Sequence, residues 1–170
     1  VSTERVVSWL REFRPKTGDF YFVPAGTPHA VGGGVTLLEI QENSDLTYRM
    51  YDWDRKDREM HTTKALGCLS KKPTAVAKIR PPSGRENGFL RLLKSPFFRV
   101  YQKATRARYE FPASRSFRAR ASIVVATVGA TDVSWKGRKA RLARGAAVVI
   151  PRGLDVSFSP LGATEVVVIQ

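Results

Sequence analysis

This chain of 170 residues has one cysteine, two histidines and no long apolar run. Because Cys68 is the only cysteine, no internal disulfide can form, and a small fold stapled by disulfides is excluded. Every apolar run falls well short of the ~18 residues that a membrane-spanning helix needs. Residues 1–13 are mixed and charged, without the apolar core of a signal peptide. We therefore expect a cytoplasmic protein with no membrane partner.

Acidic residues are scarce in the second part of the chain. The net charge is +14, but residues 1–66 carry 9 Lys or Arg and 10 Asp or Glu, whereas residues 67–170 carry 20 and 5. Basic surfaces favour phosphate or nucleic-acid partners. Here the cations are scattered along strand-like segments and build no known nucleic-acid motif, so we interpret them as a solvated face. We expect no specific nucleic-acid partner.

The change in charge predicts two units, residues 1–66 and residues 96–170, joined by a connecting segment over residues 67–95. The connecting segment is rich in proline and basic residues, and prolines are typical of linkers. Residues 4–13 and 56–66 have helical patterns. Three strand-like runs precede the connection, at residues 20–23, 35–41 and 46–51. Beyond it, short β-branched or aromatic runs recur at roughly 8–12-residue intervals, as in a β-sandwich or barrel. The predicted fold class is all-β with a few short helices.

A twelve-residue frame occurs twice in the chain. It reads glycine, five residues, proline, one residue, glycine, two residues and a variable position, which is His29 in the first copy and Val156 in the second. The pattern predicts a strand that enters a tight Pro-x-Gly turn, where proline sets the bend and glycine supplies backbone freedom. The variable residue then points into a barrel. We expect one barrel with an imidazole inside and a second that can only pack.

The residues around the first copy resemble a known signature. The frame itself resembles the second conserved motif of the cupins, small jelly-roll barrels that often hold a metal. Residues 24–32 (PAGTPHAVG) and 38–55 (LEIQENSDLTYRMYDWDR) resemble class I mannose-6-phosphate isomerases, or phosphomannose isomerases, in their short bacterial form. The strong match covers about residues 17–66. The resemblance implies cupin-like jelly-roll barrels from the C-terminal portion of that family, a partial first barrel and a second, metal-free barrel.

The resemblance also implies an activity and a site. The family interconverts mannose 6-phosphate and fructose 6-phosphate, so a phosphorylated sugar is the expected substrate and zinc the expected cofactor. His29 would be one zinc ligand, Arg49 the active-site arginine, and Glu39 a residue that lines the pocket and contacts the sugar. The residue types suit this chemistry. A divalent metal polarises the sugar oxygens, an arginine pairs with phosphate or developing negative charge, and a carboxylate shuttles the proton.

Each of these residues also has a structural interpretation. Arg49 would instead form a salt bridge to one of three nearby aspartates, Asp45, Asp52 or Asp54. Glu39 would be an exposed strand residue. A lone histidine is more often structural than a ligand, and we expect His61 to be a packing or capping residue.

The sequence departs from the family at the metal. A catalytic zinc usually takes three protein ligands, yet the only histidine besides His29 is His61. We therefore expect the chain to begin partway through the first barrel, to expose sheet edges that a second copy would cover, and to be nearly inactive alone. Two further interpretations remain open, a non-catalytic cupin-like binding module and, from charge alone, a nucleic-acid-binding β domain.

Overall fold

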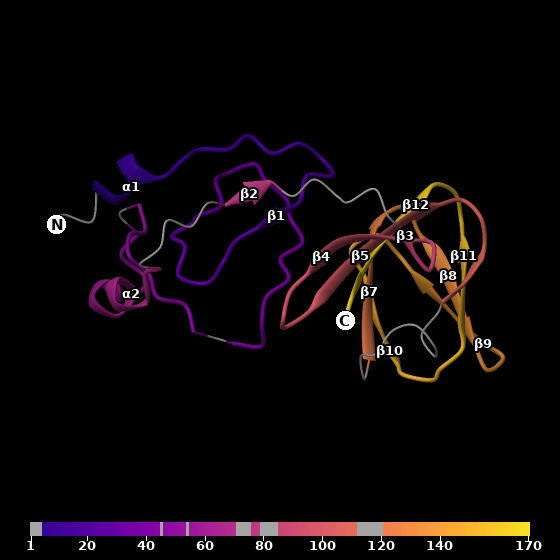
Figure 1. Ribbon diagram of the computed structural model, residues 1–170. Coiled ribbons are helices and arrows are strands. Elements are labelled where there is room, and N and C mark those ends of the chain that lie inside the picture. Colours follow the sequence, from indigo (N-terminus) through magenta and orange to yellow (C-terminus); the bar gives the residue numbers. More distant parts are fainter. Residues whose placement is uncertain (1–4, 45, 54, 71–75, 79–84, 112–120) are drawn as a thin grey trace. The chain divides into compact units, whose positions relative to one another are not determined.

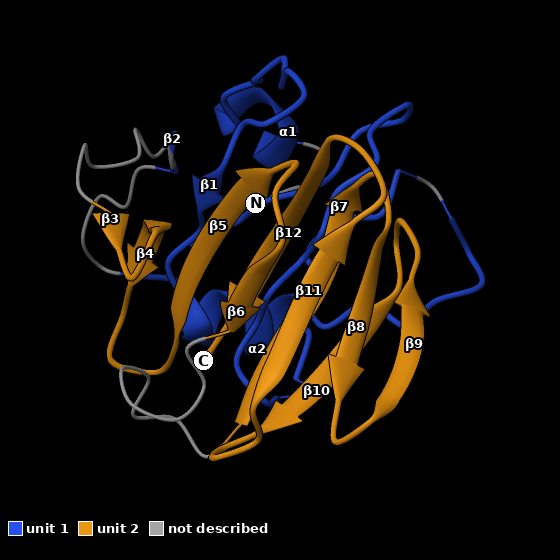
Figure 2. Ribbon diagram, turned by 90° about the vertical axis from the view of Figure 1, so that its right-hand side faces the viewer, with its two compact units in different colours: residues 1–79 blue, residues 80–170 orange. Residues whose placement is uncertain are grey.

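The computed structural model describes residues 5–44, 46–53, 55–70, 76–78, 85–111 and 121–170. The chain divides into two compact units, residues 1–79 and residues 80–170, which are drawn in different colours in Figure 2. This division falls inside the segment 67–95 that the sequence predicts as a connection.

Unit 1 has little regular structure in its described part. Its elements are α1 (Arg5–Trp9), β1 (Tyr21–Phe22), α2 (Thr62–Cys68) and β2 (Ala77–Lys78), as labelled in Figure 1. Strands β1 and β2 pair antiparallel. Both helices are shorter than predicted. The second begins six positions late, because the backbone N–H of His61 bonds to the carbonyl of Arg49 at 2.8 Å instead of continuing a helix from residue 56.

The predicted strands at residues 35–41 and 46–51 differ from the structure, which shows no strand there. A strand needs a neighbour to complete its backbone hydrogen bonds. Within the described part of unit 1, the β1–β2 pair is the only strand pairing, so the predicted partial barrel is represented by these two short strands.

The turn of the first frame copy folds as predicted. Gly26 has φ +76, a conformation that glycine adopts without strain. A Cβ at this position would lie 2.7 Å from the carbonyl oxygen of Cys68, and the N–H of Ser70 donates to the Gly26 carbonyl at 3.0 Å. Glycine therefore lets this turn approach the chain that follows α2.

Unit 2 consists of two antiparallel sheets. The six-stranded sheet has the order β10-β7-β12-β5-β4-β3, and the four-stranded sheet has the order β6-β11-β8-β9. The strands are β3 (Arg85–Glu86), β4 (Phe89–Lys94), β5 (Arg99–Thr105), β6 (Tyr109–Phe111), β7 (Ala121–Val128), β8 (Thr131–Trp135), β9 (Arg138–Leu142), β10 (Ala147–Pro151), β11 (Val156–Pro160) and β12 (Thr164–Ile169).

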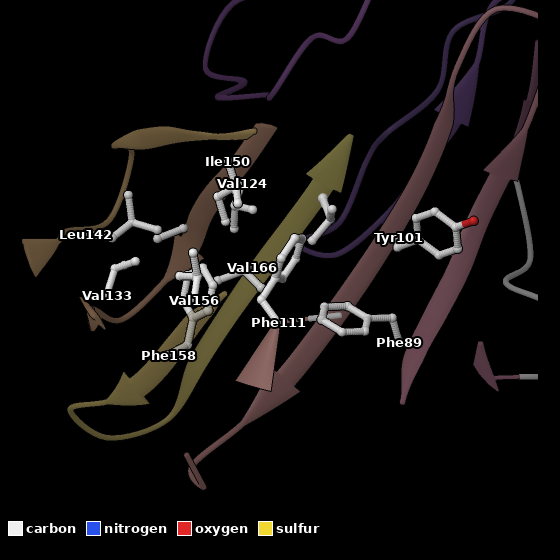
Figure 3. Packing of buried hydrophobic residues seen from close by; sticks show 12 residues of the cluster. Phe89, Tyr101, Phe111, Val124, Val133, Leu142, Ile150, Val156, Phe158 and Val166 are labelled. Carbon is white, nitrogen blue, oxygen red and sulfur yellow. The ribbon is translucent and has the colours of Figure 1, made fainter. Parts of the chain in front are cut away.

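The core of unit 2 is built from the inward-facing residues of both sheets. On the six-stranded sheet, Val124 and Val166 are buried, and their strand neighbours face the other way. From the four-stranded sheet, Phe158 packs flat on Tyr109 with ring centroids 5.2 Å apart and lies tilted against Phe111 at 5.8 Å. Figure 3 shows Phe158 and Phe111 in this core, together with Val124 and Val166. The predicted all-β fold with few short helices is confirmed.

Residues 85–94 of the predicted connection form a β-hairpin. Strands β3 and β4 pair with Glu86 opposite Phe89, which leaves a two-residue turn of Asn87 and Gly88. Both turn residues have positive φ, 55° and 77°. This is the twist-matched turn that Asn-Gly favours in hairpins. These residues are therefore part of the six-stranded sheet and not a linker, whereas residues 71–75 and 79–84 of the predicted connection lie outside the described residues.

Candidate functional site

Arg49 is held by a carboxylate and a backbone carbonyl in unit 1. Its Nη1 donates to the carbonyl of Glu59 at 3.0 Å, and its Nε lies 3.7 Å from Oδ2 of Asp52. Asp52 is 8% exposed, and its other oxygen accepts a 2.5 Å bond from Arg58. Two guanidinium groups thus share one carboxylate, and the three side chains together carry a net positive charge. The salt bridge predicted as the alternative for Arg49 is present with Asp52, while Asp45 and Asp54 lie outside the described residues.

His61 contacts the backbone of Arg49. The N–H of His61 donates to the Arg49 carbonyl, and the N–H of Arg49 points to Nδ1 of His61 at a long 3.4 Å. In this contact Nδ1 is the acceptor, so the single N–H proton of the neutral imidazole is on Nε2. This Nε2 lies 3.6 Å from a carboxylate oxygen of Glu59. His61 also precedes α2 and packs edge-on to Tyr48. Sequence reasoning did not detect that His61 positions Arg49, because the two residues are 12 apart and share no periodic pattern.

His29 is exposed and not enclosed in a barrel, which differs from the position that the frame predicts, and one of its ring nitrogens is engaged. Its Nδ1 lies 2.9 Å from the carbonyl oxygen of Thr27. A carbonyl only accepts, so Nδ1 carries the proton in this bond and Nε2 keeps its lone pair. Metal-binding histidines are commonly oriented in this way. The His29 ring can therefore supply one metal ligand, through Nε2.

The predicted site residues do not form a complete metal site. Over the residues that the structure describes, no group of three or more His, Cys, Asp or Glu side chains is placed to hold an ion. Glu39 is exposed, like His29. Within the same described ranges, no hydrogen bond or ion pair links any two of His29, Glu39 and Arg49. These residues therefore do not fit a zinc ion by themselves.

Strand β1 is fixed to β2 by a charged contact. Nζ of Lys78 lies 2.6 Å from a carboxylate oxygen of Asp19, and the N–H of Lys16 donates to the other oxygen at 3.0 Å. The hydrogen bond from Lys78, followed by that from Lys16, holds the pKa of the Asp19 carboxyl below its usual range. Asp19 is the second residue of the frame that ends at His29, so this contact ties the start of the frame to β2.

Comparison with known proteins gives relatives of one kind. No family model matches the chain. It is 36% identical over 116 residues to a probable mannose-6-phosphate isomerase, GmuF, of Bacillus subtilis, covering 64% of this chain and 36% of that protein. It is 53% identical over 65 residues to the mannose-6-phosphate isomerase ManA of the same organism, covering 35% and 21%. A mannose-6-phosphate isomerase of Streptococcus mutans is 43% identical over 100 residues, covering 55% and 31%.

The fold agrees with these relatives. The crystal structure of the Bacillus subtilis mannose-6-phosphate isomerase superposes with a TM-score of 0.60 and 24% identity, over 75% of this chain and 41% of that one. The cupin-like fold and the resemblance to mannose-6-phosphate isomerases are therefore confirmed. The chain spans less than half the length of each of these relatives. Among the described residues, no helix is both long enough and apolar enough to cross a membrane.

Proposed function

We propose that this chain takes part in the interconversion of mannose 6-phosphate and fructose 6-phosphate, an aldose–ketose isomerisation. The observation that carries the proposal is the 53% identity to ManA over 65 residues. The relatives are named for this activity, but the chain covers only part of each of them. The activity of the whole enzyme is therefore a proposal for this chain.

Arg49 is the residue that we propose to bind the anionic substrate. Asp52 is shared with Arg58, so it does not cancel the charge of Arg49. A guanidinium has five N–H donors, and the contacts to Asp52 and Glu59 engage only two of its nitrogens. The remaining donors can bind phosphate bidentately or stabilise the negative charge of an enediolate.

Glu39 and His29 take supporting roles in the proposal. Glu39 is an exposed carboxylate that can accept a hydrogen bond from a sugar hydroxyl or shuttle a proton between neighbouring carbons. His29 offers Nε2 as a single donor toward a divalent metal such as zinc. The described residues do not complete a metal site, so further ligands would be needed to hold such an ion.

A non-catalytic cupin-like binding module is the second candidate. It is favoured by Val156, which occupies in unit 2 the frame position that His29 occupies in unit 1 and is buried in the core. A barrel with an apolar side chain at this position can pack around it but cannot use it to bind a metal. A cytoplasmic location and pairing with a second copy stay predictions of the sequence.

The proposal is tested by titrating the full chain with mannose 6-phosphate and following the backbone amides by two-dimensional NMR. Arg49→Ala should weaken binding about tenfold or more, the effect of losing a charge-assisted hydrogen bond. Arg55→Ala is the matched control, because Arg55 is exposed on the same segment and carries the same charge. Equal weakening by both variants would show that general electrostatics, and not a site at Arg49, attracts the sugar phosphate.

A further inference from the structure

Two cations of unit 2 converge on one backbone oxygen. The carbonyl of Gly88, in the turn between β3 and β4, accepts from Nζ of Lys103 at 3.1 Å and faces Nη1 of Arg85 at 3.4 Å. Arg85 comes from β3 and Lys103 from β5, so the sheet brings together two positive charges that lie 18 positions apart in the sequence. Gly88 has no side chain, and a Cβ there would lie 3.2 Å from the Lys103 nitrogen.

The ammonium group of Lys103 is held in place by aromatic rings. Its Nζ lies 4.9 Å from the ring centroid of Phe89 and 4.9 Å from that of Tyr109. Both rings are fixed in turn, since Phe89 is 1% exposed and Tyr109 stacks on Phe158 in the core. The two cation–π contacts and the Gly88 carbonyl restrain a side chain that would otherwise move freely. A restrained cation loses little further freedom when it binds an anion.

The two charges lack an acidic partner in the described parts of the chain. The acidic residue of the hairpin, Glu86, is engaged by Arg91 at 3.4 Å and by the hydroxyl of Tyr101 at 3.3 Å. Burial lowers the pKa of the Lys103 amine, and the charge of Arg85 lowers it further. Like charges held together in this way repel each other, and an anion that contacts both cations through other N–H groups would relieve the repulsion. The Gly88 carbonyl occupies one ammonium donor and one guanidinium donor, so several N–H groups remain for such an anion.

We propose that Arg85 and Lys103 form a binding site for a phosphate group at the β3–β4 hairpin of unit 2. Two cations that share one backbone oxygen lie close together and suit a single compact dianion, whereas a nucleic-acid backbone needs cations spaced along a surface. The ligand is either free inorganic phosphate or the phosphate of a small sugar ester. This site goes beyond the proposed isomerase site, whose residues all lie in unit 1.

The test titrates the full chain with inorganic phosphate and follows the amides of Gly88 and its neighbours by two-dimensional NMR. Lys103→Met removes the charge and keeps an apolar chain over the rings, and Arg85→Gln removes the other charge. We expect each to weaken phosphate binding at least fivefold, and Lys103→Arg to retain it. Lys139→Met is the control, because Nζ of Lys139 already pairs with Asp132 at 2.8 Å, and it should leave the dissociation constant within twofold of the parent.

Two further titrations separate the sources of phosphate. If mannose 6-phosphate shifts the same hairpin amides and Lys103→Met abolishes those shifts, the site accepts the ester as well as the free ion. Arg49→Ala should leave these shifts unchanged, which keeps a failure of this proposal distinct from a failure of the isomerase proposal. The proposal is overturned if Lys103→Met binds phosphate as the parent does, if Lys139→Met weakens binding equally, or if a short duplex DNA displaces phosphate from the hairpin at lower concentration than the ester does.

Discussion

Phe158 offers a direct test of how unit 2 is held together. Its side chain is fully buried and contacts two other aromatic rings, those of Tyr109 and Phe111. Replacing a buried phenylalanine by alanine removes its transfer free energy and leaves a cavity, which together typically cost about 3–5 kcal/mol. Since domains of this size are usually stable by only about 5–15 kcal/mol, Phe158→Ala should remove a large share of the stability of unit 2.

The unfolding of unit 2 can be followed by Trp135, which packs against its core. The other tryptophans, Trp9 and Trp53, lie in unit 1 and would be replaced by phenylalanine in both the parent and the variants. With a urea dependence of about 1–3 kcal/mol per molar, a loss of about 4 kcal/mol should lower the midpoint by at least about 1 M. Phe97→Ala is the control, because Phe97 is 68% exposed, and it should stay within about 0.5 kcal/mol of the parent. A Phe158→Ala midpoint equal to that of Phe97→Ala would refute the packing described here.

Two further substitutions test the turn and the charged contact of unit 2. Gly129 has φ +67, and a Cβ there would lie 2.3 Å from the carbonyl oxygen of Ala163, whereas Gly137 has φ +74 and open space around it. Gly137→Ala should therefore cost only the left-handed strain of about 1–2 kcal/mol, and Gly129→Ala about 1–3 kcal/mol more in urea unfolding. For the pH test, hydrogen bonds from Lys139, then Arg141, lower the pKa of Asp132. The folded carboxyl thus holds its proton less tightly than the unfolded one, so this stabilisation is present above about pH 4 and lost as the pH falls through the lowered value. Asp132→Asn should be less stable near neutral pH and lose less stability between pH 5 and pH 2, whereas Asp155→Asn, at an exposed position, should lose as much as the parent. Equal acid slopes for Asp132→Asn and the parent would refute this assignment.

Turns that are specified by adjacent residues can be predicted from the sequence. The Pro-x-Gly frame places its glycines at positive φ, because the turn is specified by residues that are adjacent in the chain. The Asn87-Gly88 turn carried an equally clear hairpin signal. It was missed because the neighbouring prolines and lysines favour a linker, and the hairpin becomes stable only when β5 pairs with β4.

Contacts between distant residues cannot be predicted in this way. The run at residues 35–41 has the composition of a strand, but composition does not supply a neighbouring strand. Lys103 of β5 lies over Phe89 of β4 and Tyr109 of β6, and β6 belongs to the other sheet. A strand pattern does not say which sheet each successive strand joins. The Arg49–Asp52 pair was among the alternatives, since three positions separate these residues. The contact between His61 and Arg49 depends on how the chain returns before α2.

The most direct test of the proposed function is turnover in a chimera. Bacillus subtilis ManA is 53% identical to this chain over 65 residues. The segment of ManA that corresponds to residues 17–66 of this chain, which include His29, Glu39 and Arg49, would be replaced by those residues, and conversion of mannose 6-phosphate measured by coupled detection of fructose 6-phosphate. If His29, Glu39 and Arg49 take part in the reaction, the chimera should turn over substrate. Arg49→Ala in that chimera should reduce kcat by about 100-fold or more, the usual effect of removing a group that stabilises charge in the transition state. A folded chimera that is inactive, or one whose Arg49→Ala variant is as active as the chimera itself, would contradict the account.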